Sequence, residues 1–384
     1  MTMTTDPPIP LIATADDRAR TGTGQPLPPG HGNNPQRISQ ATYGRFRTID
    51  LHITEARHPR RPPCQPGGRS EQGRKMSWSQ ICTALDVWRH LGGTALTILG
   101  GESSLHPDFV HALRYARAIG YDEIATVTDG LAPAARTLRG LAPTELSYVQ
   151  ISLDGGSHLT HDQLHGPGAF ATTMATAADL TERGFDVRFT CTVSRTNRDD
   201  CLKLLDLADR LGIRRITYQA LSPIGRGRAD HGAALTPREW IAFYQQLPGA
   251  AAGHSTDVHY QPAHAYPDTL DAFTATGYPG CRGRTLDRIS LFPDGRCYLC
   301  SALAGTDLHY ATMTPDGTIT LNRDDNEFDL FTATLTHPAC GVCTLRPACG
   351  GGCPAETVLT GSASCADDPG ILPVCRLWTT PLPT

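Results

Sequence analysis

The sequence predicts an α/β fold built on a parallel sheet, followed by a small cysteine-rich region. From Phe46 to about Leu247, short apolar runs rich in β-branched residues alternate with amphipathic helical stretches. From about Gly253 this alternation ends, and short hairpin-like pieces surround the cysteines. Repeated β/α units imply a parallel sheet, because right-handed crossovers place the helices outside it. Periodicity does not show whether the sheet closes, but in either case ligands are expected at the carboxyl ends of the strands.

The elements of the first region follow in order. Six apolar runs, each ending at a polar or glycine turn, predict strands: TIDLHIT, ALTILGG, EIATVTD, YVQISLD, DVRFTCTVS and RITYQALS. Helical spacing predicts four helices between them: SWSQICTALDVWRHLGG, FVHALRYARAIG, ATTMATAADLTERG and DCLKLLDLADRLG. In the first of these, apolar residues recur at i, i+3 and i+4 before Gly92 ends the pattern: Trp78, Ile81, Cys82, Leu85, Trp88 and Leu91.

Composition and charge limit the classes of function. Residues 1–44 are rich in Pro, Gly, Thr and Asn without periodicity, and we expect a disordered segment there. The formal net charge of −4 argues against a general nucleic-acid binder. No apolar run approaches the roughly 18 residues of a membrane span, and the first residues lack a secretory signal pattern. We therefore expect a cytoplasmic protein that binds neither nucleic acid nor membranes.

Cysteine content points to metal. The chain has 13 cysteines, most of them from Cys281 onward. In a reducing compartment such a group favours metal binding over disulfides. Two-residue spacings, as in CGVC, allow two thiolates to converge on one centre, and the three glycines of CGGGC permit close turns around it. Zinc and iron–sulfur clusters both remain open at this point.

The spacing of these cysteines resembles the SPASM domain, the C-terminal extension of radical S-adenosylmethionine (SAM) peptide maturases. Cys281, 13 residues, Gly295, four residues and Cys300 precede a C-x2-C-x5-C-x3-C run and a late cysteine. The resemblance implies two auxiliary [4Fe–4S] clusters. It would place Cys281, Cys300 and Cys353 on the first cluster, whose fourth ligand stays open. The second cluster would take the remaining matched thiols, Cys340, Cys343, Cys349 and Cys375. Cys297 and Cys365 fall outside the pattern and are either extra ligands or plain thiols.

The first region resembles the partial (β/α)6, TIM-like barrel of the radical SAM superfamily. The motifs that carry this resemblance are LGGESSLHPDF after the second strand, VTDG after the third, ISLDG at the fourth and LSPIGRGR after the sixth. The resemblance implies a SAM pocket that contains Gly100, Gly101, Glu102, Ser152, Asp154 and His165. The expected organisation is a disordered segment (1–44), a radical SAM-like partial barrel (45–250) and a SPASM-like iron–sulfur domain (251–384).

The loop after the first strand departs from this family. The family carries C-x3-C-x2-C there, three thiolates for a [4Fe–4S] cluster that activates SAM. An ungapped alignment places Arg57, Arg61 and Cys64 on the three positions. A guanidinium stays protonated and has no lone pair to offer a metal. His165 stands where the family has an arginine for the SAM carboxylate, and Ser103 replaces a proline. The third, core cluster is therefore doubtful.

Several alternatives remain for this region. His58 with Cys64 would be an unusual ligand pair, whereas Cys82 fits helix packing better. Cys191 and Cys201 are expected to be core or near-surface thiols. The cationic stretch around the loop is either solvated or the mouth of an anion site, and its residues are Arg57, His58, Arg60 and Arg61.

Three functional hypotheses follow. The first is an iron–sulfur protein of ribosomal-peptide (RiPP) modification with a degenerate SAM-activating site. It would act as a partner of an active radical SAM enzyme or as a subunit that handles the peptide substrate or precursor peptide. The second is an active radical SAM peptide maturase, an oxidoreductase with a non-standard core cluster and SAM bound at Glu102. The third is a binding module stabilised by zinc. Whether the chain is an enzyme stays open at this stage.

Overall fold

The structure is a computed structural model that describes residues 46–57, 73–221, 233–275, 277–322, 353–355 and 370–382. The expected disordered segment lies outside the described residues. So do loop residues His58, Arg60, Arg61 and Cys64, and four tail cysteines, Cys340, Cys343, Cys349 and Cys365. In the described part of the chain, no helix has the length and apolar character needed to cross a membrane.

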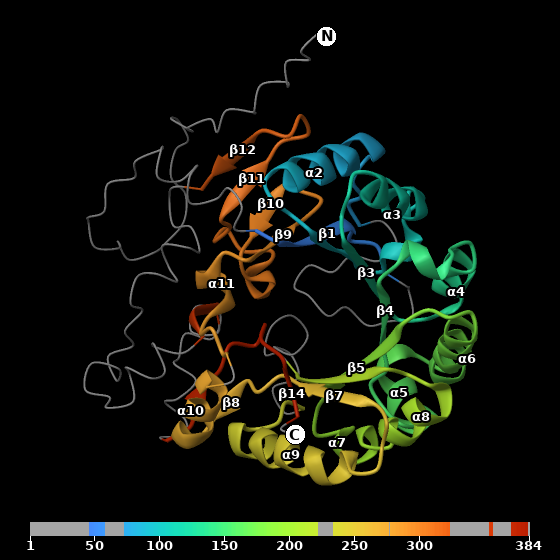
Figure 1. Ribbon diagram of the computed structural model, residues 1–384, viewed down its shortest axis with the longest axis vertical. Helices are drawn as coiled ribbons and strands as arrows, with labels where there is room; N and C mark the ends of the chain where they lie inside the picture. Colours follow the sequence, from blue (N-terminus) through green and yellow to red (C-terminus); the bar gives the residue numbers. More distant parts are fainter. Residues whose placement is uncertain are drawn as a thin grey trace.

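One continuous curved sheet organises the described residues (Figure 1). Its order is β12-β11-β10-β9-β1-β2-β3-β4-β5-β6-β7-β14. The parallel part consists of β1 (Thr48–Thr54), β2 (Ala95–Gly100), β3 (Glu123–Thr128), β4 (Tyr148–Ser152), β5 (Val187–Val193), β6 (Arg215–Ala220) and β7 (Asp257–Tyr260). The carboxyl ends of these strands therefore meet at one edge.

The C-terminal region adds strands to both ends of the parallel part. β9 (Arg288–Leu291) pairs parallel to β1, and an antiparallel meander continues from it through β10 (Arg296–Tyr298), β11 (Ala311–Met313) and β12 (Ile319–Leu321). At the other end, β14 (Thr380–Pro381) pairs antiparallel to β7. β8 (His264–Ala265) and β13 (Leu372–Pro373) form a separate two-stranded pair.

Helices cover the outer side of the curved sheet (Figure 1). They include α2 (Trp78–His90), α3 (Phe109–Ala118), α4 (Ala132–Leu138), α6 (Ala169–Glu182), α8 (Leu204–Leu211) and α9 (Pro237–Ala251). Shorter helices are α5 (His158–His165), α7 (Arg198–Cys201), α10 (Pro267–Ala275) and α11 (Arg282–Thr285). Single 3₁₀ turns lie at η1 (Ser103–Leu105), η2 (Pro143–Glu145) and η4 (Ser301–Leu303).

The prediction of an α/β partial barrel with a C-terminal extension is confirmed. All six predicted strands form, and β1 spans the whole of TIDLHIT. A seventh parallel strand, β7, follows α9, and the alternation pattern did not reveal it. The sheet runs without a break through β7 and, by way of β1, into β9, so the division at residue 250 stays a prediction.

Local sequence signals explain the boundaries of α2. Its N-cap Ser77 accepts from the backbone N–H of Gln80, and the Gln80 side chain accepts from the N–H of Ser77, which is a complete capping box. Ile81, Leu85 and Trp88 are buried, as their spacing predicted. Trp78 was expected on the same apolar stripe, but it is 39% exposed. At the first helical position it packs edge-on against the rings of His111 and Tyr115 on α3 instead.

Candidate functional site

The GGE turn lies directly against the end of β1. The N–H of Gly101 donates to the carbonyl of Thr54 at 2.9 Å, and the N–H of Glu102 donates to that of Ala56 at 2.8 Å. A Cβ atom added at Gly101 would lie 2.2 Å from the Ala56 oxygen and 2.4 Å from Cγ of Arg57. Only glycine permits this approach, so the sequence motif holds the loop after β1 against the loop after β2.

The Glu102 carboxylate is buried and accepts four hydrogen bonds from within the chain. Oε1 accepts from the N–H of Ser104 at 3.2 Å and from its hydroxyl at 2.6 Å. Oε2 accepts from the hydroxyl of Thr128 at 3.0 Å and from the N–H of Asp129 at 3.0 Å. A carboxylate has about four lone-pair positions, so these donors occupy its acceptor capacity.

The electrostatic surroundings of Glu102 do not favour its charged form. Burial raises the pKa of this carboxyl most, and the negative charge of nearby Asp129 raises it further, to about 7. The bonds from Ser104 and Asp129 act in the opposite direction but do not outweigh desolvation. Near neutral pH the side chain is therefore protonated for a large part of the time.

A second buried pair lies farther along the same sheet edge. His165, on α5, donates through Nε2 to Oδ2 of Asp154 at 2.7 Å. The other carboxylate oxygen of Asp154 accepts from the N–H of Thr192 on β5 at 2.6 Å. Asn197 fixes the local backbone by donating from Nδ2 to the Asp154 carbonyl at 2.9 Å. The structure thus joins two predicted site residues, Asp154 and His165, in one buried hydrogen-bonded pair.

His161 also belongs to this group, and the sequence reasoning missed it. Its ring stacks on that of His165 with centroids 4.1 Å apart, and its Nδ1 accepts from the N–H of Asp154 at 3.1 Å. The i, i+4 spacing within HDQLH on a predicted turn of helix was the available signal. Nδ1 of His165 is buried and has no hydrogen-bond partner among the described residues. Ser152, the remaining predicted pocket residue, ends β4 and is half-buried.

Arg57 is the one aligned ligand position that the structure describes. The described residues stop at Arg57 and resume at Gly73, where an added Cβ would lie 2.6 Å from the backbone of Glu55. The N–H of Glu55 donates to the Arg74 carbonyl at 2.8 Å, so both ends of the loop are held together. Burial, assisted by the Arg57 charge, lowers the pKa of His52 on β1 to about 3. His52 is therefore neutral at physiological pH.

Four tail cysteines lie together in the C-terminal region. The thiol of Cys281 interacts with those of Cys300, Cys353 and Cys375, and it is hydrogen-bonded to Cys375. This bond raises the pKa of Cys281, the donor, and lowers that of Cys375, the acceptor, to about 6. The N–H of Arg282 also donates to Sγ of Cys375, at 3.4 Å. Among the residues that the structure describes, no three His, Cys, Asp or Glu side chains converge on one metal ion, so the assignment of Cys281, Cys300 and Cys353 to one cluster stays a prediction.

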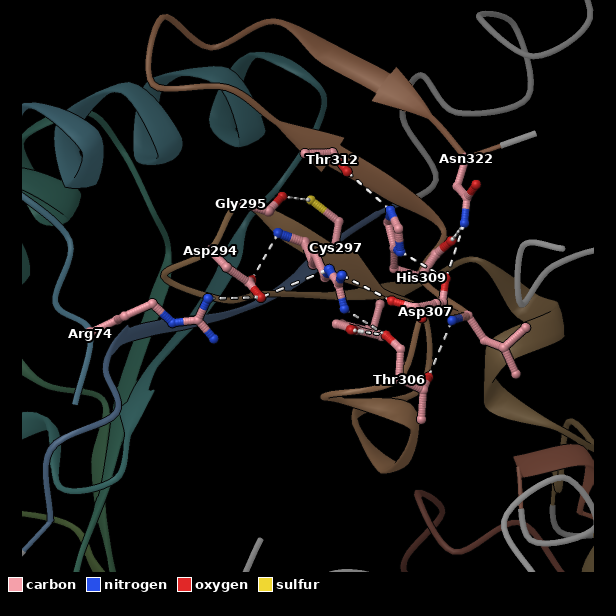
Figure 2. A network of polar contacts seen from close by, with 12 residues as sticks. Arg74, Asp294, Gly295, Cys297, Thr306, Asp307, His309, Thr312 and Asn322 are labelled. Atoms are coloured by element: carbon pink, nitrogen blue, oxygen red, sulfur yellow. Dashed lines mark hydrogen bonds and ion pairs between the residues drawn. The ribbon is translucent and has the colours of Figure 1, made fainter. Parts of the chain in front are cut away.

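Cys297 has different surroundings (Figure 2). It is fully buried on β10, and its thiol donates to the Gly295 carbonyl at 3.7 Å. Around it Arg296 bonds Asp307 at 3.0 Å, and Arg74 lies 3.5 Å from Asp294, which connects the return of the β1 loop to the β9–β10 turn. Cys297 was expected to be either an extra cluster ligand or a plain thiol, and these contacts favour a plain thiol packed within the sheet. Cys82 is half-buried on α2, and Cys191 and Cys201 are buried thiols of the barrel.

These features define a class of protein: a parallel partial barrel with acidic side chains at its carboxyl edge and a cysteine-rich C-terminal extension. The family model described as "Radical SAM superfamily" matches residues 62–208. Over these residues the chain is similar to proteins of the radical SAM superfamily.

Individual relatives extend beyond the barrel. The chain is 27% identical over 310 residues to the PqqA peptide cyclase of Ruegeria pomeroyi, a match that covers 79% of each chain. It is 29% identical over 308 residues to the mycofactocin maturase MftC of Mycobacterium ulcerans, covering 79% of this chain and 81% of that protein. Among solved structures, Streptococcus suis SuiB bound to its precursor peptide SuiA is similar in fold. The TM-score is 0.68 at 13% identity, and the match covers 89% of this chain and 82% of SuiB.

Proposed function

We propose that this protein takes part in ribosomal-peptide modification as a radical SAM/SPASM-type iron–sulfur protein whose SAM-activating site has degenerated. It would bind a precursor peptide and act beside an active radical SAM enzyme, with auxiliary [4Fe–4S] clusters retained in its tail. A peptide substrate is supported by two relatives that are named for peptide cyclisation and for maturation. It is also supported by a protein of similar fold that was solved with its precursor peptide.

The hydrogen bonding of Glu102 is the main observation in support of a degenerate SAM-activating site. By resemblance, this carboxylate would hold the SAM amino group. Here Ser104, Thr128 and Asp129 already supply four donors to it. An incoming ammonium would have to displace one of these bonds and also keep the carboxyl ionised against a pKa raised to about 7. The residues present do not fit the SAM amino group.

The loop after β1 and the position of His165 also support a degenerate SAM-activating site. Arg57 and Arg61 stand on two of three thiolate positions, and neither can ligate iron. The match to the family model begins at residue 62, downstream of both. His165, on the position of the carboxylate-binding arginine, already donates to Asp154. For the auxiliary clusters the support is the cysteine spacing of the tail, from Cys281 to Cys375, because thiolates are the ligands that such clusters take. Bound there, such clusters would supply electron transfer.

An active maturase with a non-standard core cluster is the second candidate. The glycine approach at Gly101 and the acidic side chains Glu102 and Asp154 are all retained at the sheet edge, which favours it. A zinc-stabilised binding module is the third candidate, since zinc also binds sets of four cysteines.

Anaerobic purification with iron, sulfide and zinc analysis separates these functions. We expect about eight irons and eight sulfides per chain, little zinc, and no 5′-deoxyadenosine when SAM and dithionite are added. About twelve irons together with SAM cleavage would show an active maturase instead, and zinc without iron would show the binding module. The double variant Arg57→Cys/Arg61→Cys restores the three-thiolate spacing and should gain about four irons. Binding of a precursor peptide should not require SAM.

A further inference from the structure

The inner face of the curved sheet is polar, in contrast to the apolar face under the helices (Figure 1). On β5, Val187 and Phe189 are at most 2% exposed, whereas the alternate residues Arg188 and Thr192 are half-buried. The same holds for inward positions of the neighbouring strands, at Thr97, Gln150, Thr217, Gln219 and His259. A barrel interior that forms a packed core is filled mainly by branched apolar side chains. The inside of this sheet is instead a surface suited to a polar ligand.

One row of this inner face has an apolar half and a cationic half. The strand registers join, in order, His52, Leu99, Val127, Gln150, Arg188, Arg215 and Asp257. On the apolar side, the ring of Phe292 stacks on that of His52 with centroids 4.0 Å apart. The other half contains two arginines on adjacent strands. A ligand that spans the row would therefore meet apolar side chains on one side and positive charge on the other.

The two arginines are held in place by separate carboxylates. Arg188 on β5 and Arg215 on β6 are direct partners in the strand register. Nε and Nη2 of Arg188 donate to Oδ2 of Asp186 at 3.3 and 2.8 Å, and its guanidinium lies 3.8 Å from the ring centroid of Tyr148. Nε of Arg215 donates to Oδ2 of Asp257 at 2.8 Å. Because like charges repel when they are directly opposite on neighbouring strands, each carboxylate offsets the charge of its own arginine.

These bonds leave hydrogen-bond donors on both guanidinium groups. In the described part of the chain, Nη1 of Arg188 and Nη1 of Arg215 have no acceptor, and the two side chains are 25% and 35% exposed. Thr190, the next inward residue on β5, is only 6% exposed, and its hydroxyl has no hydrogen-bond partner among the described residues. Two guanidinium groups and a buried hydroxyl thus lie at neighbouring inward positions. Planar donors of this kind match the two oxygens of a carboxylate.

We infer that Arg188 and Arg215 bind the carboxylate of an Asp or Glu side chain of the precursor peptide. The apolar half of the row, with His52 and Phe292, would contact apolar side chains of the same peptide segment. The bonds to Asp186 orient Arg188 before the ligand arrives, which lowers the entropy lost on binding. The inference rests on the proposed function, because it takes the ligand to be a peptide.

A library of synthetic decapeptides, acetylated and C-terminally amidated, tests this inference on the anaerobically purified full chain. Amidation ensures that any carboxylate comes from a side chain. Each sublibrary fixes one residue type at one position, and competition with a fluorescent library member, followed by anisotropy, measures its affinity. In wild-type protein, Asp or Glu at one position should bind roughly tenfold more tightly than Asn or Gln there, as expected for a charge-assisted hydrogen bond.

Arginine variants locate the preference. Arg188→Gln and Arg215→Gln should each abolish the difference between acidic and amide peptides, with little change in the affinity of the amide peptides. Arg114→Gln is the matched control, because Arg114 forms an ion pair with Glu145 at 2.6 Å from helix α3, outside the sheet. This variant should keep the preference. Far-UV circular dichroism and thermal melts establish that each variant folds, and the comparison of acidic with amide peptides on wild-type protein needs no variant.

The failure of this inference is distinguishable from that of the proposed function. Wild-type protein that binds peptides without preferring acidic residues would overturn the inference and leave the proposed function standing. A preference that survives in both Arg188→Gln and Arg215→Gln would also overturn it, because the carboxylate would then bind elsewhere. Wild-type protein that binds none of the sublibraries would contradict peptide binding, and with it the proposed function.

Discussion

The hydroxyl of Ser104 donates to Oε1 of Glu102 at 2.6 Å, inside the glycine turn after β2. The N–H of the same serine donates to the same oxygen. One residue therefore occupies half of the acceptor capacity of the carboxylate. Hydrogen-bond donors of the protein itself thus occupy the Glu102 carboxylate. Substitution of Ser104 tests how much these bonds contribute.

Ser104→Ala should lower the free energy of unfolding by about 1.5–3 kcal/mol, the usual worth of a buried hydrogen bond to a charged group. The loss should shrink in mild acid, because a protonated Glu102 is a weaker acceptor. Urea unfolding at two pH values measures both effects. Ser79→Ala is the control: Ser79 is exposed and its hydroxyl is hydrogen-bonded to that of Ser77, so its change should stay within about 0.5 kcal/mol. Equal effects of the two variants would show that the Ser104 bond contributes nothing.

Glu102 should make the folded state less stable as pH rises. Its carboxyl holds a proton more tightly in the folded chain, since the pKa rises from an ordinary 4.5 to about 7. Stability is thus fully retained below about pH 4.5 and falls through the window up to about 7, by up to roughly 3 kcal/mol. Glu102→Gln removes this dependence, so the difference between variant and wild type should grow in favour of the variant across that window.

Glu239 is a control whose effect on the pH dependence of stability has the opposite sign. Its pKa is lowered to about 2, first by the hydrogen bond from Arg195, so its contribution is present above about pH 4.5 and lost toward pH 2. Glu239→Gln should therefore be less stable than wild type at neutral pH, and the difference should vanish in acid. Chemical unfolding from about pH 2 to 8 compares the three proteins and covers the titration windows of both carboxyls. The prediction for Glu102 is wrong if both variants show the same slope.

Asp154 and His165 should be energetically coupled. His165→Phe leaves Oδ2 of Asp154 buried without its donor, which should cost about 2–4 kcal/mol. Adding Asp154→Asn removes the charge and should recover part of that loss, with a coupling energy of about 1–3 kcal/mol in a double-mutant cycle. His111→Gln affects an exposed histidine 3.7 Å from Asp108 and should change stability by less than about 1 kcal/mol. Strict additivity at Asp154 and His165 would refute the coupling.

The junction between barrel and tail depends on a buried carboxylate. Asp50 on β1 faces Arg288 on β9 at 3.4 Å, and burial raises the pKa of Asp50 despite that cation. Arg288→Ala should destabilise the protein by about 3 kcal/mol at neutral pH, because it leaves a buried charge without compensation. The loss should decrease as pH falls and Asp50 takes up a proton. Arg74→Ala removes the ion pairs of Arg74 with Asp294 at 3.5 Å and with Glu55 at 2.8 Å. The Arg74 side chain is 61% exposed, so the variant should cost under about 1 kcal/mol by thermal melting (Figure 2). A similar cost for both variants would contradict this distinction.

The sequence by itself determined the strand and helix order of the barrel and the glycine turn at its edge. Period-two and period-3.6 patterns report which face of a segment is buried, so segments such as TIDLHIT were predictable from the residues alone. The spacing of the tail cysteines likewise indicated a metal-binding region. In the loop after β1, the prediction that Arg57 and Arg61 stand on two thiolate positions came from residue identity alone, and it stays a prediction.

Tertiary structure decided the contacts between distant segments. No periodicity could show that Ser104, Thr128 and Asp129 saturate Glu102, that His165 pairs with Asp154, or that Cys375 lies beside Cys281. These groups come from different strands and loops, and a hydrogen bond requires positions correct to a few tenths of an ångström. Such positions are set by the packing of the whole sheet. Residue types therefore indicate the chemistry of the site, but they do not show which hydrogen-bond donors contact which acceptor.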